Sequence, residues 1–240
     1  MKEEYFKWHS DYLNREFEML VFGHSGYPVI LFPPSRGRFY DNKEFGMIGS
    51  AADLIDQGKI KIYCPDSADA QSWYNFSINP SERVTTHIAY ENTIINEVIG
   101  YIKHDTGLDK TAATGCSLGA YHAANLAFRH PDLISHVFGM GGIFNIKQFI
   151  FGFYDDNSYF NNPPDYLPNL NDPWYLDRIR EMKIVLGTGS DDMYLKENIS
   201  LSDILKQKNI NHWLDIRNSE GNDFSAWRKM LPRYLGLING

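Results

Sequence analysis

Residues 111–120 read TAATGCSLGA, a short run of small residues that leads through Gly-x-Ser-x-Gly into an alanine-rich segment ending at Arg129. A nucleophilic serine must project from a tight turn between a strand and a helix, where residues two positions to either side have no room for side chains. Gly115 and Gly119 meet that condition. The stretch therefore predicts a nucleophile elbow with Ser117 at its tip, and the amide of Leu118 would donate to a tetrahedral oxyanion. The alternative is a plain glycine-rich strand end.

Short apolar runs alternate with longer amphipathic segments along the chain. We expect strands over 18–22, 28–32, 59–64, 111–115, 136–140, 182–187 and 212–216, and helices over 45–56, 88–104, 118–130, 193–208 and 224–235. Most of the strands are bare apolar runs, as is typical of strands buried on both faces. The turn at Gly23–Gly26 predicts a hairpin between the first two strands. The expected fold class is therefore α/β, with a mostly parallel central sheet, an antiparallel start and helices on both faces, in a single domain over 1–240.

Composition limits the kinds of partner. The chain has 240 residues, a formal net charge of −7 and 43% hydrophobic residues, which excludes intrinsic disorder and argues against binding to nucleic acid or a membrane surface. Two cysteines, Cys64 and Cys116, lack the spacing of a disulfide framework or a zinc site. We expect no metal and no cofactor, because metal-ligand and phosphate-loop motifs are missing from the sequence. A cytoplasmic protein is expected, and a homo-oligomer is compatible with the sequence.

Two further segments are expected near the serine. The loop after residues 28–32 should supply a second oxyanion donor, and since prolines have no N–H, Ser35 or Arg36 is the candidate. The segment 144–173 is rich in Asn, Asp, Pro, Phe and Tyr, and predicts a cap-like, loop-rich excursion over the sheet. Trp73, Arg36 and Tyr159 are the expected side chains of a substrate pocket for an ester or acyl group. The alternative for the aromatic residues is burial in the core.

A catalytic acid and a base should follow the serine in chain order. Asp192, after an apolar run and a glycine-rich turn, is the expected acid, with Asp191 as the alternative. The base should be a histidine in the loop after the last strand, but residues 217–227 contain none. His24, His122 and His212 are expected to be structural.

The chain resembles the esterase D-like branch of the α/β-hydrolase superfamily, within a group of short bacterial esterases. The resemblance extends from Phe22-Gly23-His24-Ser25-Gly26, through Ser72-Trp73-Tyr74-Asn75 and the Gly115–Gly119 elbow, to Trp227-Arg228-Lys229-Met230-Leu231-Pro232. It implies a serine-dependent carboxylic-ester hydrolase or acyltransferase that acts on a small-molecule ester.

The resemblance also implies a histidine at the position held here by Asn222. An amide cannot take a proton from a serine hydroxyl near neutral pH. Three interpretations remain open: another base reaches Ser117, with Asp223 as one candidate; the substrate supplies its own base; or the protein is an impaired pseudo-hydrolase that binds a ligand or a partner.

Overall fold

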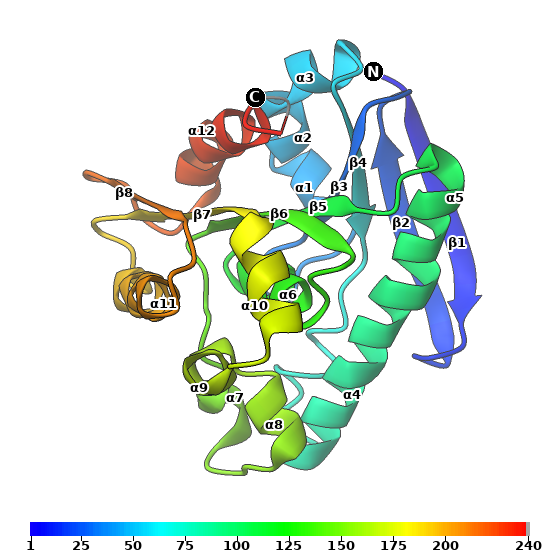
Figure 1. Cartoon of the computed structure of the whole chain (residues 1–240). Coiled ribbons are helices and arrows are strands. Elements are labelled where there is room, and N and C mark those ends of the chain that lie inside the picture. The colour runs from blue at the N-terminus through cyan, green and yellow to red at the C-terminus, as the bar shows by residue number, and fades with distance from the viewer. Residues whose placement is uncertain (239–240) are drawn as a thin grey trace.

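A computed structural model describes residues 1–238, which form one eight-stranded sheet with helices on both faces (Figure 1). The strands are β1 (Glu3–Ser10), β2 (Arg15–Phe22), β3 (Tyr27–Phe32), β4 (Ile60–Pro65), β5 (Thr111–Cys116), β6 (Ile134–Met140), β7 (Lys183–Gly189) and β8 (Trp213–Arg217). The helices are α1 (Asp41–Glu44), α2 (Met47–Ser50), α3 (Ala52–Asp56), α4 (Pro80–Thr93), a π-helical turn η1 (Ile94–Val98), α5 (Ile99–Thr106), α6 (Leu118–Arg129), α7 (Lys147–Ile150), α8 (Asp156–Phe160), α9 (Pro163–Asn169), α10 (Pro173–Glu181), α11 (Leu195–Gln207) and α12 (Phe224–Leu235).

The order of strands across the sheet is β1-β2-β4-β3-β5-β6-β7-β8. β1 pairs with β2, and β2 with β4, in antiparallel orientation, whereas all pairs from β4 to β8 are parallel. Parallel strands need long crossovers, which the intervening helices provide. The expected α/β class, with an antiparallel start, is confirmed.

The predicted hairpin across Gly23–Gly26 is wrong. Both glycines have positive φ (108° and 115°) and do reverse the chain, but β2 and β3 do not pair with each other, because β4 lies between them and bonds to both. The antiparallel hairpin at the start of the sheet is β1–β2 instead. β1 was not among the expected strands, since its alternating exposed and half-buried residues are those of an edge strand with one face toward solvent.

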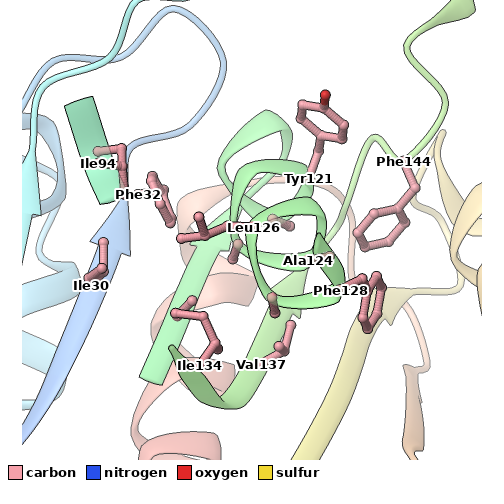
Figure 2. Close-up of a cluster of buried hydrophobic side chains, with 14 of the residues drawn as sticks. Ile30, Phe32, Ile94, Tyr121, Ala124, Leu126, Phe128, Ile134, Val137 and Phe144 are labelled. Carbon is pink, nitrogen blue, oxygen red and sulfur yellow. The ribbon is translucent and has the colours of Figure 1, made fainter. Parts of the chain in front are cut away.

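Two hydrophobic cores lie on the two faces of the sheet. One joins the sheet to α4, α5, α6, α10 and α11, and the other joins it to α2, α3 and α12. Helix α6 is buried along nearly its whole length. Figure 2 shows this helix within the first core, among side chains that include Phe32 of β3 and Val137 of β6. Burial of apolar side chains at about 25 cal/mol per Å² therefore holds the segment that follows Ser117 firmly on the sheet.

The excursion at 144–173 consists of three short helices joined by turns and loops. It forms α7, α8 and α9, which pack against α4, α6 and α11 (Figure 1). Pro163 begins α9, and Asp155 caps α8 by accepting a hydrogen bond from the Ser158 amide at 2.7 Å. Among residues 1–238, no helix is both long and apolar enough to cross a membrane.

Candidate active site

Ser117 has a strained backbone conformation between β5 and α6. Its φ is 55° and its ψ is −120°, a combination that residues with a side chain rarely adopt. The surrounding structure holds it there: the Ser117 amide donates to the Met140 carbonyl at 2.9 Å, and its carbonyl accepts from the Ile143 amide at 3.2 Å. This is the geometry of a nucleophile elbow, as the motif predicted.

The two glycines of the motif are required by close packing. A Cβ on Gly115 would overlap the backbone of Gly119, and a Cβ on Gly119 would overlap the carbonyl oxygen of Pro33. The close approach of Gly119 to Pro33 means that the loop after β3 packs against the first turn of α6. The sequence spacing therefore reflects a contact between two segments that both border Ser117.

Ser117 is nearly buried, with 7% of the residue exposed. Among residues 1–238, the hydrogen-bond partner of its hydroxyl is the hydroxyl of Ser35, with 2.9 Å between the two Oγ atoms. The neighbouring Cys116 is fully buried, and burial raises the pKa of its thiol well above the ordinary value. Cys116 therefore stays protonated and does not compete as a nucleophile.

The candidate oxyanion donors are backbone amides on the two segments that flank Ser117. Leu118 is the first residue of α6, and amides of a first helical turn have no acceptor within the helix. In the loop after β3, the Arg36 amide donates to Asp69 Oδ2 at 3.0 Å, so it is already bonded. Of the two loop residues expected from the sequence, this leaves the Ser35 amide as the second candidate donor.

Asp69 was not anticipated from the sequence. It is fully buried, and while its Oδ2 accepts from the Arg36 amide, its Oδ1 accepts from His122 Nε2 at 2.8 Å. Arg36 has a φ of 60°, so the bond to Asp69 holds a loop residue in a left-handed conformation. Asp69 therefore fixes the peptide next to Ser35. Its position soon after β4, at the same edge of the sheet as the elbow, was the only sequence signal for it.

Asp192 turns inward from the loop after β7 and is 5% exposed. Its Oδ2 accepts from Thr188 Oγ1 at 2.9 Å, and its Oδ1 accepts from the Tyr194 amide at 2.7 Å. Asp191, the alternative, is exposed, and its amide donates to the Glu220 carbonyl. The structure thus places Asp192, and not Asp191, on the inner side of this turn.

Asn222 lies against Asp192. Its Nδ2 donates to Asp192 Oδ1 at 2.8 Å and to the Gly141 carbonyl at 2.9 Å. Gly141 has a φ of 57°, and a Cβ at this position would overlap the Asn222 amide. Asp223, the other candidate base, caps α12 by accepting from the amides of Ser225 and Ala226, which turns its carboxylate toward the helix.

The histidines considered from the sequence have other contacts. His122 bonds to Asp69, and His212 bonds to Ser202 Oγ at 2.7 Å and to the Ile210 carbonyl at 2.9 Å. Among residues 1–238, no hydrogen bond joins an imidazole to the Ser117 hydroxyl. The same part of the chain contains no cluster of three or more His, Cys, Asp or Glu residues suited to a metal ion.

Of the three expected pocket residues, Arg36 follows Ser35 in the loop beside the serine, whereas Trp73 and Tyr159 lie elsewhere. Arg36 is exposed on the loop after β3, with its guanidinium 5.4 Å from the Tyr74 ring centroid. Trp73 is fully buried and packs on Tyr121, so the expectation that it lines a pocket is wrong and its alternative, burial in the core, holds. Tyr159 lines a cavity at the far end of α6, about 18 Å along the helix from Ser117.

A serine in a strand-to-helix elbow on a mostly parallel sheet, with a carboxylate after a later strand, defines the class of α/β-hydrolases. The profile of the family described as "Putative esterase" matches residues 10–237. The chain belongs to this family and is a carboxylic-ester hydrolase by family.

Several solved structures share this fold. A ferulic acid esterase is 18% identical with a TM-score of 0.80, covering 99% of this chain and 97% of its own. S-formylglutathione hydrolase from Staphylococcus aureus is 14% identical with a TM-score of 0.71, covering 100% and 99%. A ferulic acid esterase from Anaeromyces mucronatus is 15% identical with a TM-score of 0.75, covering 98% and 89%. At these identities the likeness concerns the fold. A search of curated protein sequences gave no significant match.

Proposed function

We propose that the protein cleaves activated carboxylic esters at Ser117, by a route that uses an oxyanion hole but no histidine base. The observation that carries this proposal is the conformation of Ser117, whose strained backbone presents the hydroxyl at the start of α6 beside the Ser35 loop. Strain of this kind persists only where the surrounding structure enforces it.

The two candidate amides would stabilise the charge that develops during acyl transfer. As Ser117 Oγ bonds to the carbonyl carbon, the carbonyl oxygen becomes an oxyanion, to which the amides of Leu118 and Ser35 would donate. A single oxyanion donor contributes about 10²–10³ in turnover in a characterised serine protease. The positive end of the α6 dipole adds to this effect.

The Asp192–Asn222 pair can orient groups but cannot accept the serine proton. The amide nitrogen of Asn222 already donates to Asp192 Oδ1, and an amide has no usable basicity near neutral pH. The proton on Ser117 Oγ therefore passes to hydroxide or water. Acylation should accordingly rise in proportion to hydroxide concentration rather than level off near pH 7.

The lack of a histidine also limits the class of substrate. When the tetrahedral intermediate collapses, the bond from carbon to the leaving oxygen or sulfur breaks, and no histidine is present to protonate the leaving group. Phenolates and thiolates leave as anions, whereas alkoxides do not leave readily without a proton. The favoured substrates are thus aryl esters and thioesters, and water then hydrolyses the acyl-serine to release the acid. A second alcohol in place of water would make the reaction an acyl transfer.

Labelling with a fluorophosphonate, read by intact mass, tests this proposal. Attack by Ser117 Oγ on phosphorus expels fluoride and leaves one adduct per chain, so we expect a single adduct that forms faster as pH rises. Ser117→Ala should abolish the adduct, and Ser81→Ala, an exposed serine on α4, should leave it unchanged. Absence of any adduct after hours at pH 9 would refute the proposal and favour a pseudo-hydrolase that binds a ligand or partner. Product ratios from a phenyl ester, with and without glycerol, separate hydrolysis from acyl transfer.

A further inference from the structure

One cavity in the fold lies well away from Ser117. It has a volume of about 620 Å³ and is enclosed by α4, α6, α8, α9 and the start of α10. Its inner wall is the carboxyl-terminal end of α6, about 18 Å along that helix from the elbow. The excursion at 144–173, whose helices lie together beside α4 in Figure 1, forms the outer wall. The volume falls within the roughly 300–1,000 Å³ of small-molecule sites.

Aromatic rings line this cavity. Tyr159, Phe160, Tyr166 and Tyr175 come from α8, α9 and α10, and Phe160 is 55% exposed. Tyr159 and Phe160 are in edge contact, with ring centroids 4.9 Å apart. A large ring left in solvent costs free energy unless something covers it. The negative faces of such rings attract weakly positive C–H groups.

Side-chain amides supply the polar part of the lining. Asn157, Asn161, Asn169 and Asn171 all border the cavity. The Asn169 side chain is held in place, because its Nδ2 donates to the Tyr159 hydroxyl and to the Asp165 carbonyl, both at 3.1 Å. The Tyr159 hydroxyl can then still donate, and Asn169 Oδ1 can still accept. Asn161 Oδ1 already accepts from Arg129 and Asn171 Oδ1 from Lys208, so Tyr159 and Asn169 carry the open donor and acceptor. Groups that donate and accept side by side match the hydroxyls of a ligand.

The charge around the cavity is balanced. The Arg129 guanidinium at its inner wall is paired with Glu91 at 2.6 Å, and the same carboxylate contacts His130 at 2.8 Å. Asp172 at the rim caps α10 through the Trp174 amide. No excess positive charge remains on the lining to hold a phosphate or a carboxylate.

From these three properties we propose that this cavity binds a neutral carbohydrate, with the sugar rings against the tyrosines and the hydroxyls on the asparagines. The proposal goes beyond ester cleavage and stands whether or not Ser117 is an active nucleophile.

Nuclear magnetic resonance titration of the ¹⁵N-labelled full chain tests this site directly. Cellotetraose, xylotetraose and maltotetraose are the neutral probes, and phenyl phosphate is the anionic one, all added to the Ser117→Ala variant so that no chemistry interferes. We expect saturable shifts of the Asn169 and Asn171 side-chain amides with at least one tetrasaccharide, at a Kd of about 1 mM or tighter.

Variants then locate the site. Tyr159→Ala and Asn169→Ala should each weaken binding by about tenfold or more, and Tyr159→Phe, which keeps the ring, by a few-fold. Tyr12→Ala, an exposed tyrosine in the β1–β2 turn, is the matched control and should bind as the parent does. The proposal is overturned if all three tetrasaccharides give no saturable shift, if phenyl phosphate binds more tightly than they do, or if folded Tyr159→Ala retains full binding.

Discussion

Asn222→His should restore a general base to the site. The Nδ1 atom of a histidine is separated from its Cα by the same number of bonds as Nδ2 of an asparagine. It can therefore take the place from which Asn222 Nδ2 now donates to Asp192 Oδ1 at 2.8 Å. The ring's Nε2 then extends further from Asp192, which is the arrangement in which a carboxylate orients a catalytic imidazole. Asn222 is half-buried, and Gly141 beside it has no side chain to obstruct a ring.

The size of the gain follows from what the site already contains. With the elbow and the proposed oxyanion donors in the parent, its rate enhancement should correspond to the roughly 10³–10⁴ that a serine protease keeps without its triad. A positioned general base contributes about 10²–10⁴. We therefore expect Asn222→His to raise kcat/KM for short-chain p-nitrophenyl esters by about 10²-fold or more, which is about 2.7 kcal/mol of transition-state stabilisation.

The assay is p-nitrophenolate release across pH 5–10 in the parent and three variants. In the parent, log(kcat/KM) should rise with a slope near one. In Asn222→His it should level off above the pKa of an imidazole, near 7. Asn222→Gln keeps an amide and should gain nothing, and Ser117→Ala/Asn222→His should lose the gain. A folded Asn222→His variant with an unchanged rate and pH profile would refute the assignment of Asn222 to the base position.

Two further outcomes are expected. Asp69→Ala releases the Arg36 amide and with it the neighbouring Ser35 amide, so kcat for aryl esters should fall about tenfold or more with little change in KM; an unchanged kcat would show that the loop holds itself in place. Burial lowers the pKa of His136 to about 4, so between pH 6.5 and pH 4 the unfolded chain binds a proton that the native state does not. As the pH decreases across this window, the free energy of unfolding should therefore decrease by about 2 kcal/mol, allowing for partial exposure. Urea melts at pH 7 and 4.5 should show a smaller loss in His136→Gln, and equal losses would contradict this origin.

The elbow could be predicted because its requirements are local. Gly115, Ser117 and Gly119 lie within five residues, and a strand that turns sharply into a helix makes the same demand in any protein that contains it. The parallel strands were predicted for a similar reason, since burial on both faces leaves a run of apolar residues. These features are properties of short segments, so the order of residues is enough to specify them.

Strand pairing and pocket composition could not be predicted in this way. The turn at Gly23–Gly26 reverses the chain, but β4, more than thirty residues further on, takes the place between the two strands that the turn connects. Trp73 and Tyr159 are equally aromatic, yet one is fully buried and the other borders a distant cavity. Aromatic side chains serve the core and binding sites alike, and only packing against other segments distinguishes the two.

The sequence by itself determined the position of the serine, the class of the fold and the lack of a histidine in the last loop. Tertiary structure alone decided that Asn222 lies on Asp192, thirty residues away, and that Asp69 holds the Arg36 amide. Local sequence specifies backbone conformation through sterics and burial pattern. Contacts between distant loops depend on how the whole sheet and its helices pack, because each loop is positioned by the elements at its two ends.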